Sequence, residues 1–272
     1  MNSGPGGGRP PSGLFYWQSY LQENLGIVDL NSVAVVLTIF LAIFTQSLTG
    51  FGTGLVSMAL LPALVDIRTA APLVALTAGT LEFALVIRYR DTLNIQSVWQ
   101  LLLAAIVGIP LGIELLRNLD ERVVLTCLGI LLVAYPLYVF GSPQLPKLEG
   151  RPWPYAFGFV AGLLGGAYNT SGPPLIIFGD SQRWAHAEFK ANLQGFFLLN
   201  DVLVITSHAL SGNLTPAVWQ YYLLTLPGVA LGMVGGLALG RLINPATFRT
   251  IVLALLIVLG LRMILGALMV GG

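Results

Sequence analysis

The feature that most constrains the fold of this chain is a succession of long apolar segments that carry few charged residues. Several of them reach the ~20 consecutive residues that an α-helix needs to cross a ~30 Å hydrocarbon core. Of the 272 residues, 56% are hydrophobic and only 9% are charged. The sequence therefore predicts an all-α polytopic membrane protein with no room for a sizeable soluble domain.

The composition also disfavours several functional classes. The net charge of +1 gives no indication of a nucleic-acid partner. The single cysteine, Cys127, excludes an intrachain disulfide and a CxxC motif. Two histidines, His186 and His208, are too few for a histidine-based metal cage, so we expect neither a metal nor a cofactor. The 32 glycines suit close helix packing, either within one chain or in a homodimer.

Two of the apolar segments are interrupted. Residues 157–180 indicate an apolar helix that breaks at Asn169–Pro174, where two successive prolines donate no backbone N–H. Neither arm alone is long enough to cross the hydrocarbon core. Residues 33–65 are interrupted at Thr49–Gly54. Because a broken helix is costly in lipid unless it lines a cavity, both breaks are candidate sites.

The second half of the chain repeats the first. The matching segments, 120 residues apart, are 98–100 with 218–220 and 108–112 with 228–232. The two breaks also correspond, and Glu82 corresponds to Asp201, 119 residues later. A duplicated membrane chain with a broken helix at matching places in both halves is typical of a secondary transporter.

The positions of lysine and arginine indicate how the halves are oriented, because these residues concentrate on the cytoplasmic side. If every segment crosses once, the charges divide about evenly. If each broken segment is a re-entrant hairpin, one face collects Arg88, Arg90, Lys147, Arg151, Arg183, Lys190, Arg241 and Arg249. The opposite face then holds Arg68, Arg117 and Arg122, with the terminal Arg9 and Arg262. The hairpin topology gives the better asymmetry and places both termini outside.

We therefore predict two inverted repeats, each with one broken or re-entrant hairpin and about three transmembrane helices. The expected division is a disordered tail and interfacial helix at 1–32, a first repeat at 33–140, a cytoplasmic linker at 141–154 and a second repeat at 155–272. The aromatic segment before residue 30 could equally be a lead-in to the first span.

The two helix restarts are candidate binding sites for a small anion. The first N–H groups of a helix are unpaired and carry partial positive charge, and glycine lets backbone approach a ligand closely. The candidate substrate-binding residues are Thr49, Gly50, Phe51, Gly52, Thr53 and Gly54 at the first break and Asn169, Thr170, Ser171, Gly172 and Pro173 at the second. The alternative is that both breaks are kinks with packing glycines.

Charged residues suggest two further roles. Glu82 and Asp201 lie deep in predicted spans, where a carboxylate is costly and usually functional. They could couple transport to protons, or they could be satisfied structural groups near a break. Lys190, closely followed by Asn192, could attract anions to the cytoplasmic mouth, or it could snorkel to the membrane interface.

An intramembrane serine hydrolase is the alternative from another class. Ser171 could act as a nucleophile if a histidine base lay within reach, and His208 is the candidate base. His208 falls near the end of a predicted span, where an interfacial histidine is the simpler interpretation. We therefore expect a transporter and not an enzyme, with a carrier or channel for another anion as the nearer alternative.

Three motifs resemble the sulfite exporter TauE/SafE family. They are NTSGPPLIIF at 169–178, EFKANLQGFF at 188–197 and GFGTG at 50–54, and the resemblance extends from about Val33 to Leu265. It implies an inner-membrane permease that exports sulfite, sulfoacetate or a related organosulfonate and is driven by an ion gradient. The binding candidates it implies are 50–54 and 169–173, with Lys190 and Asn192 at the flank. Membership of a broad family does not fix the substrate.

Overall fold

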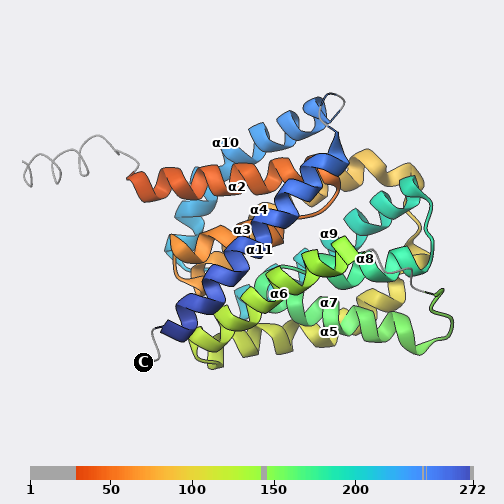
Figure 1. Cartoon of the computed structure of the whole chain (residues 1–272), viewed down its shortest axis with the longest axis horizontal. Helices are drawn as coiled ribbons and strands as arrows, with labels where there is room; N and C mark the ends of the chain where they lie inside the picture. The colour runs from red at the N-terminus through yellow and green to blue at the C-terminus, as the bar shows by residue number, and fades with distance from the viewer. Residues whose placement is uncertain (1–28, 142–145, 241, 243, 270–272) are drawn as a thin grey trace, which may run out of the picture.

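The computed structural model describes residues 29–141, 146–240, 242 and 244–269, which form a bundle of long helices around short ones (Figure 1). This described part of the chain contains helices and no strand, which confirms the predicted all-α membrane fold. The elements are α2 (Leu30–Thr49), α3 (Thr53–Leu60), η1 (Leu61–Ala63), α4 (Ile67–Tyr89), η2 (Arg90–Thr92), α5 (Ile95–Asn118), α6 (Glu121–Gly141), α7 (Pro152–Tyr168), α8 (Gly172–Ser181), α9 (His186–Leu210), α10 (Pro216–Leu239) and α11 (Pro245–Met269).

Among the described residues, seven helices are long and apolar enough to cross a membrane: α2, α4, α5, α6, α9, α10 and α11. The last six are the spans expected outside the two broken segments, three in each half of the chain. The α2 helix has 20 residues, whereas α7 has 17 and α8 has 10. The first break therefore follows a helix of spanning length, and the second joins two shorter arms.

A left-handed residue ends the helix before each break. Gly50, with φ of 93°, ends α2, and its N–H donates to the Gln46 carbonyl at 2.7 Å. Asn169, with φ of 51°, ends α7 in the same conformation. Glycine adopts this region without a steric penalty, and asparagine is the residue that most often takes its place at helix ends.

The second break is shorter than the sequence suggested. The expected interruption was Asn169–Pro174, but α8 begins at Gly172, so both prolines lie inside its first turn. Proline suits that position because the N–H groups of the first turn have no partner within the helix and because its fixed φ is helical. The prolines therefore start a helix here and do not extend the break.

Each half of the chain packs on the other through corresponding helices. The α5 helix lies along α7, and the corresponding α10 lies along α2; α6 packs on α11, and α4 packs on α9. In Figure 1, α2 and α10 run together along the top of the view, and α5 and α7 run along the bottom. Each broken segment is therefore held by a helix of the opposite half.

The glycine motif shared by the two halves makes these contacts possible. A Cβ atom added to Gly112 of α5 would lie 2.1 Å from the Leu163 carbonyl oxygen in α7. One added to Gly232 of α10 would lie 2.8 Å from the Phe40 carbonyl oxygen in α2. The matched glycines at 108–112 and 228–232 thus let helix backbones touch at both of these contacts between the halves.

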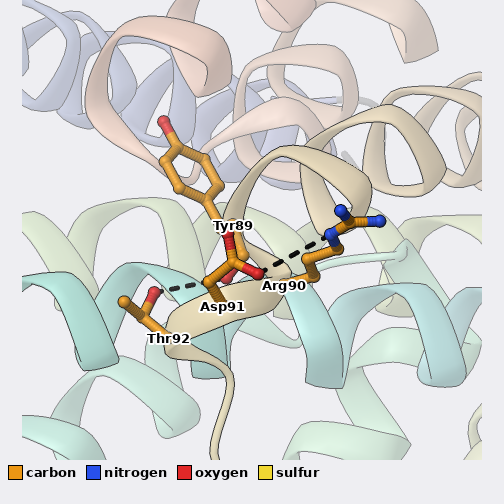
Figure 2. Close-up of polar contacts among 4 residues, drawn as sticks. All are labelled: Tyr89, Arg90, Asp91 and Thr92. Atoms are coloured by element: carbon orange, nitrogen blue, oxygen red, sulfur yellow. Dashed lines mark hydrogen bonds and ion pairs between the residues drawn. The ribbon is translucent and has the colours of Figure 1, made fainter.

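The turn between α4 and α5 closes one end of the bundle. Arg90 and Asp91 form an exposed ion pair at 3.7 Å, and the Thr92 hydroxyl donates to the Tyr89 carbonyl at 3.2 Å (Figure 2). Such an exposed pair contributes about 0–1 kcal/mol. The turn is therefore held mainly by its contacts with α9.

Those contacts involve Asn94, which precedes α5. Its backbone N–H donates to the Asn192 side-chain oxygen at 2.9 Å, and its side chain donates to Glu188 at 3.1 Å. Leu93 also packs against Gly195 of α9 so closely that an added Cβ there would lie 2.5 Å from Leu93. The start of α9 is thus a fixed support for the start of α5.

Part of the predicted domain division lies outside the described residues. This applies to most of the tail and interfacial helix at 1–32 and to positions 142–145 of the linker. The boundaries of the two repeats stay predictions.

Candidate functional site

The two breaks meet in the interior of the bundle and line one cavity. The cavity is tight, with about 30 Å³ open to the centre of a water molecule. It is lined by Gln46, Phe51, Gly52, Thr53, Gly54, Leu55, Ala78, Glu82, Asn169, Thr170, Ser171, Gly172, Phe197 and Asp201. Eight of the eleven break residues expected from the sequence, and both deep carboxylates, therefore surround the same space.

The backbones of the two breaks touch directly. A Cβ atom built on Gly54, at the start of α3, would lie 1.9 Å from the Asn169 carbonyl oxygen at the end of α7. At Gly172, the first residue of α8, the nearest atom to an added Cβ is the Phe197 ring at 3.6 Å. The contact between the two breaks thus requires glycine at position 54, whereas position 172 has room for a Cβ atom.

Gln46 of α2 connects the first break to a carboxylate. Its side-chain oxygen accepts the Thr53 backbone N–H at 3.0 Å, and its side-chain nitrogen donates to Glu82 of α4. Gln46 is 3% exposed and Glu82 is 2% exposed, so these bonds are shielded from solvent. One amide thereby fixes the α3 restart and one oxygen of Glu82.

The two carboxylates approach the cavity from neighbouring helices. Asp201 of α9 packs over Gly79, where an added Cβ would lie 3.6 Å from the Asp201 Cβ atom. Gly79 is nearly one turn before Glu82 on α4. One oxygen of each carboxyl group, Glu82 Oε2 and Asp201 Oδ2, is buried and has no hydrogen-bond partner in the described part of the chain. Asn169 Oδ1 and the Thr53 hydroxyl share this condition.

Unpaired buried polar atoms are costly, so this concentration marks a place built to hold something polar. Three of the four atoms are oxygens that only accept hydrogen bonds, unless the carboxyls carry a proton. No lysine or arginine lines the cavity within the described residues. A bare anion would therefore need protons, water or backbone N–H groups to bind there.

The two helix restarts differ in the donors they offer. At α3 the first three N–H groups belong to Thr53, Gly54 and Leu55, and only the Thr53 group is already bonded, to Gln46. At α8 the corresponding positions are Gly172, Pro173 and Pro174, of which only the glycine has an N–H. Of the two restarts, α3 is therefore the richer donor.

Five candidates do not line this cavity. The Thr49 hydroxyl donates to the Thr45 and Phe51 carbonyls and so shapes the break, and the Gly50 carbonyl accepts from Gln194 at 2.7 Å. Pro173 is buried in α8. Asn192 supports the start of α5, as described above. Lys190 lies beside Gly50, with its Cγ atom 3.7 Å from the position of a Gly50 Cβ.

Gln46, Leu55, Ala78 and Phe197 line the cavity but were not identified from the sequence. Gln46 carried a usable signal, because it is an uncharged polar residue within an apolar span, four residues before the left-handed glycine. Leu55, Ala78 and Phe197 have no such signal, since nothing distinguishes them from the other apolar residues of their helices.

The hydrolase alternative finds no support in this geometry. Ser171 lines the cavity, but His208 lies near the C-terminal end of α9. There the His208 Nδ1 atom is 3.0 Å from the Asn213 side-chain nitrogen. Among the described residues there is no cluster of three His, Cys, Asp or Glu side chains that could hold a metal ion.

Comparison with known proteins adds independent information on identity. The family model described as sulfite exporter TauE/SafE matches residues 35–263. The chain is also 27% identical over 237 residues to a probable sulfite/organosulfonate exporter TauE from Cupriavidus necator, covering 82% of this chain and 90% of that protein. No solved structure matches the chain significantly.

Proposed function

The chain belongs to the sulfite exporter TauE/SafE family, and we propose that it exports a small sulfur-containing anion, such as sulfite or an organosulfonate, across the inner membrane. The observation that carries the proposal is the cavity between the two breaks. It lies inside the bundle, combines backbone N–H groups with hydroxyl and carboxyl side chains, and is shared by both halves of the chain. Discontinuous helices that meet at such a site are the arrangement that secondary transporters use.

The anion would bind mainly at the α3 restart. The free N–H groups of Gly54 and Leu55 and the Thr53 hydroxyl lie on one side of the cavity, and Ser171 and Gly172 lie on the other. These groups must replace the water lost by a sulfite or sulfonate, because dehydration of an anion is costly. The partial positive charge of the helix end favours the same orientation.

Protons on Glu82 and Asp201 would complete the site. An unpaired carboxylate repels an anion, whereas a protonated carboxyl donates a hydrogen bond to it. Loading of the anion would then require loading of protons, and the two would cross the membrane together. This makes Glu82 and Asp201 the coupling residues of the proposal.

Alternating access requires two halves that can move against each other around the cavity. The reciprocal packing of α5 on α7 and of α10 on α2 supports a two-fold relation between the halves. The start of α2 and the end of α11 lie at the same side of the bundle in Figure 1, which supports both termini on one side of the membrane. We infer inverted repeats with the linker in the cytoplasm.

Counterflow in proteoliposomes tests the function. Purified protein preloaded with unlabelled sulfite is expected to accumulate labelled sulfite, and sulfoacetate in the lumen tests the wider substrate class. Saturable exchange supports the carrier, whereas an ohmic current would identify an anion channel. A protein that moves neither compound would refute the proposed substrate class.

The coupling residues are tested by the pH dependence of the same exchange. Glu82→Gln and Asp201→Asn should each make sulfite transport independent of the pH gradient. Glu114→Gln, an exposed carboxylate on α5, is the matched control and should behave as the wild type. If both cavity variants retained pH-driven accumulation, the coupling role would be wrong.

Topology is tested by cysteine accessibility in a Cys127→Ser background. An impermeant maleimide applied to intact cells should label Ser12→Cys in the tail but should label Lys147→Cys in the linker only after permeabilisation. Labelling of Lys147→Cys from outside would reverse the proposed orientation.

A further inference from the structure

A second cavity lies on the other face of the first break. It is small, with about 10 Å³ open to the centre of a water molecule, and is bounded by α2, α3 and α11. Phe51, Gly52 and Leu55 line both this space and the central cavity. Phe51 is 7% exposed, so its ring fills the partition between the two spaces.

The surface of the second cavity is apolar, and the charged residue beside it is a cation. Arg249 of α11 lines it, with its guanidinium carbon 4.9 Å from the centre of the Phe51 ring. This distance is typical of a cation–π contact. The central cavity has two carboxylates and no lining cation among the described residues, whereas this one has a cation and no lining carboxylate.

Two buried donors surround Phe51 without a partner of normal hydrogen-bond geometry in the described chain. They are the Arg249 Nε atom and the hydroxyl of Tyr135, a residue of α6 that is 3% exposed. The Tyr135 and Phe51 rings meet edge to face with 6.3 Å between centroids. Arg249 and Tyr135 are close enough to interact through charge and through a side-chain hydrogen bond of irregular geometry. The unpaired groups here are donors, where those of the central cavity are mostly acceptors.

Asp180 of α8 is the carboxylate that competes for this arginine. It lies within electrostatic reach of Arg249, but the two form no ion pair within 4.0 Å in the part of the chain that the structure describes. The guanidinium is thus not neutralised by a carboxylate, although it contacts the Phe51 ring and the Tyr135 hydroxyl. A guanidinium can bind two oxygens of one oxyanion at once, which a carboxylate, sulfite or sulfonate group provides.

We propose that Arg249, assisted by the Tyr135 hydroxyl, is an anion-binding subsite outside the central cavity, and that Phe51 is the gate between the two. This proposal rests on the proposed anion transport and adds a second binding site to the transport route. An oxyanion bound to Arg249 removes the cation from the Phe51 ring and so weakens the contact that holds the gate closed. Binding at the outer subsite thereby opens the route to the central cavity.

The subsite faces one side of the membrane only. Arg249 lies four residues after the start of α11. Lys190 lies beside Gly50, the residue that precedes Phe51 in the first break. Both belong to the basic face that the hairpin topology assigns to the cytoplasm. The loss of Arg249 should therefore change the affinity for substrate presented from that side and leave the opposite side unaffected.

The test is sulfite transport in proteoliposomes sorted by orientation, with sulfite varied on one side at a time. Arg249→Met should raise the half-saturating sulfite concentration on the Arg249 side by about tenfold or more, because a charge-assisted hydrogen-bonding group is lost. The half-saturating concentration of Arg249→Lys should lie between those of Arg249→Met and the wild type, since lysine keeps the charge but cannot bind two oxygens of one oxyanion side by side. Asp180→Asn should lower the half-saturating concentration. Arg262→Gln, near the other end of the same helix, is the matched control and should change neither side.

The gate has its own readout. Phe51→Leu should allow a sulfite leak that no longer depends on the pH gradient, because the smaller side chain leaves the partition open and the anion can pass without the coupled protons. If Arg249→Met is not monodisperse in detergent, Arg249→Lys decides the affinity test. Unchanged half-saturation in the Arg249 variants of a transporting protein would overturn the subsite and leave the proposed function standing. A wild-type protein that transports no sulfite or sulfoacetate would overturn both.

Discussion

Gly54 is the position where the smallest change should have the largest effect on transport. Its hydrogen faces the Asn169 carbonyl, and a Cβ atom there would lie 1.9 Å from that oxygen and 2.8 Å from the carbonyl carbon. Both partners are backbone atoms of helix ends, so neither can rotate away as a flexible side chain would. In Gly54→Ala the two breaks must separate.

The size of that separation follows from the contact. Real Cβ contacts essentially never fall below 3.0 Å, so α3 and the end of α7 must move apart by at least about 1.1 Å in a close-packed interior. Overpacking of this kind typically costs about 1–3 kcal/mol. Displacement of binding groups by about 1 Å can lower rates by about a hundredfold. We therefore expect a folded protein with transport reduced by one to two orders of magnitude.

Gly172→Ala provides the matched control within the same cavity. There the nearest atom to the new Cβ is the Phe197 ring at 3.6 Å, an ordinary van der Waals contact. Initial rates of sulfite counterflow and thermal unfolding in detergent should be measured for both variants in parallel. Wild-type rates in Gly54→Ala would refute the inference that the two breaks must touch, and equal loss in both variants would assign the effect to glycine itself.

Three further predictions concern residues around the cavity. Gln46→Leu should destabilise the protein by about 1–3 kcal/mol in a denaturation assay, because the Thr53 N–H and a Glu82 oxygen both lose their hydrogen-bond partner. Unchanged stability would show that water replaces the amide. Asn192→Ala should lower the melting temperature without changing the half-saturating sulfite concentration, since this side chain supports the start of α5. Gly162→Ala should disrupt the packing of α7 on α5 and reduce the yield of folded protein, because its Cβ would lie 2.6 Å from the Ala105 Cα atom.

Much of the architecture could be predicted because the membrane imposes strong rules on a sequence. Length and polarity alone identify the spans, and the duplication identifies the corresponding breaks at Gly50–Gly54 and Asn169–Gly172. The exact form of the second break was predicted less well. Proline prevents a helix from continuing but also starts one well, and the sequence alone does not decide which role Pro173 has.

The site was predicted only in part, for a related reason. Residues at the breaks carry a local signal, and the structure brings most of them to the cavity. Lys190 and Asn192 were selected for their chemistry and their place in a motif, but their positions depend on how α9 packs against other helices. Gln46 carries a local signal, but its contact with Glu82 depends on the fold. Arg249 becomes significant only because the fold places it beside Phe51, and no local pattern reveals that contact.

The predicted duplication does not require the two halves to perform the same task. Each break begins at a left-handed residue and leads into a short helix, and the reciprocal packing of the halves involves both broken segments. The donor groups of the two breaks differ. The α3 restart keeps its N–H groups and has Phe51 with Arg249 behind it, whereas α8 has replaced two N–H groups with prolines. A cavity with donors concentrated on one wall and carboxyls nearby gives a bound anion one preferred orientation. Within the proposed mechanism, the first half would therefore bind the anion, and the second half would supply the rigid surface against which the first half moves.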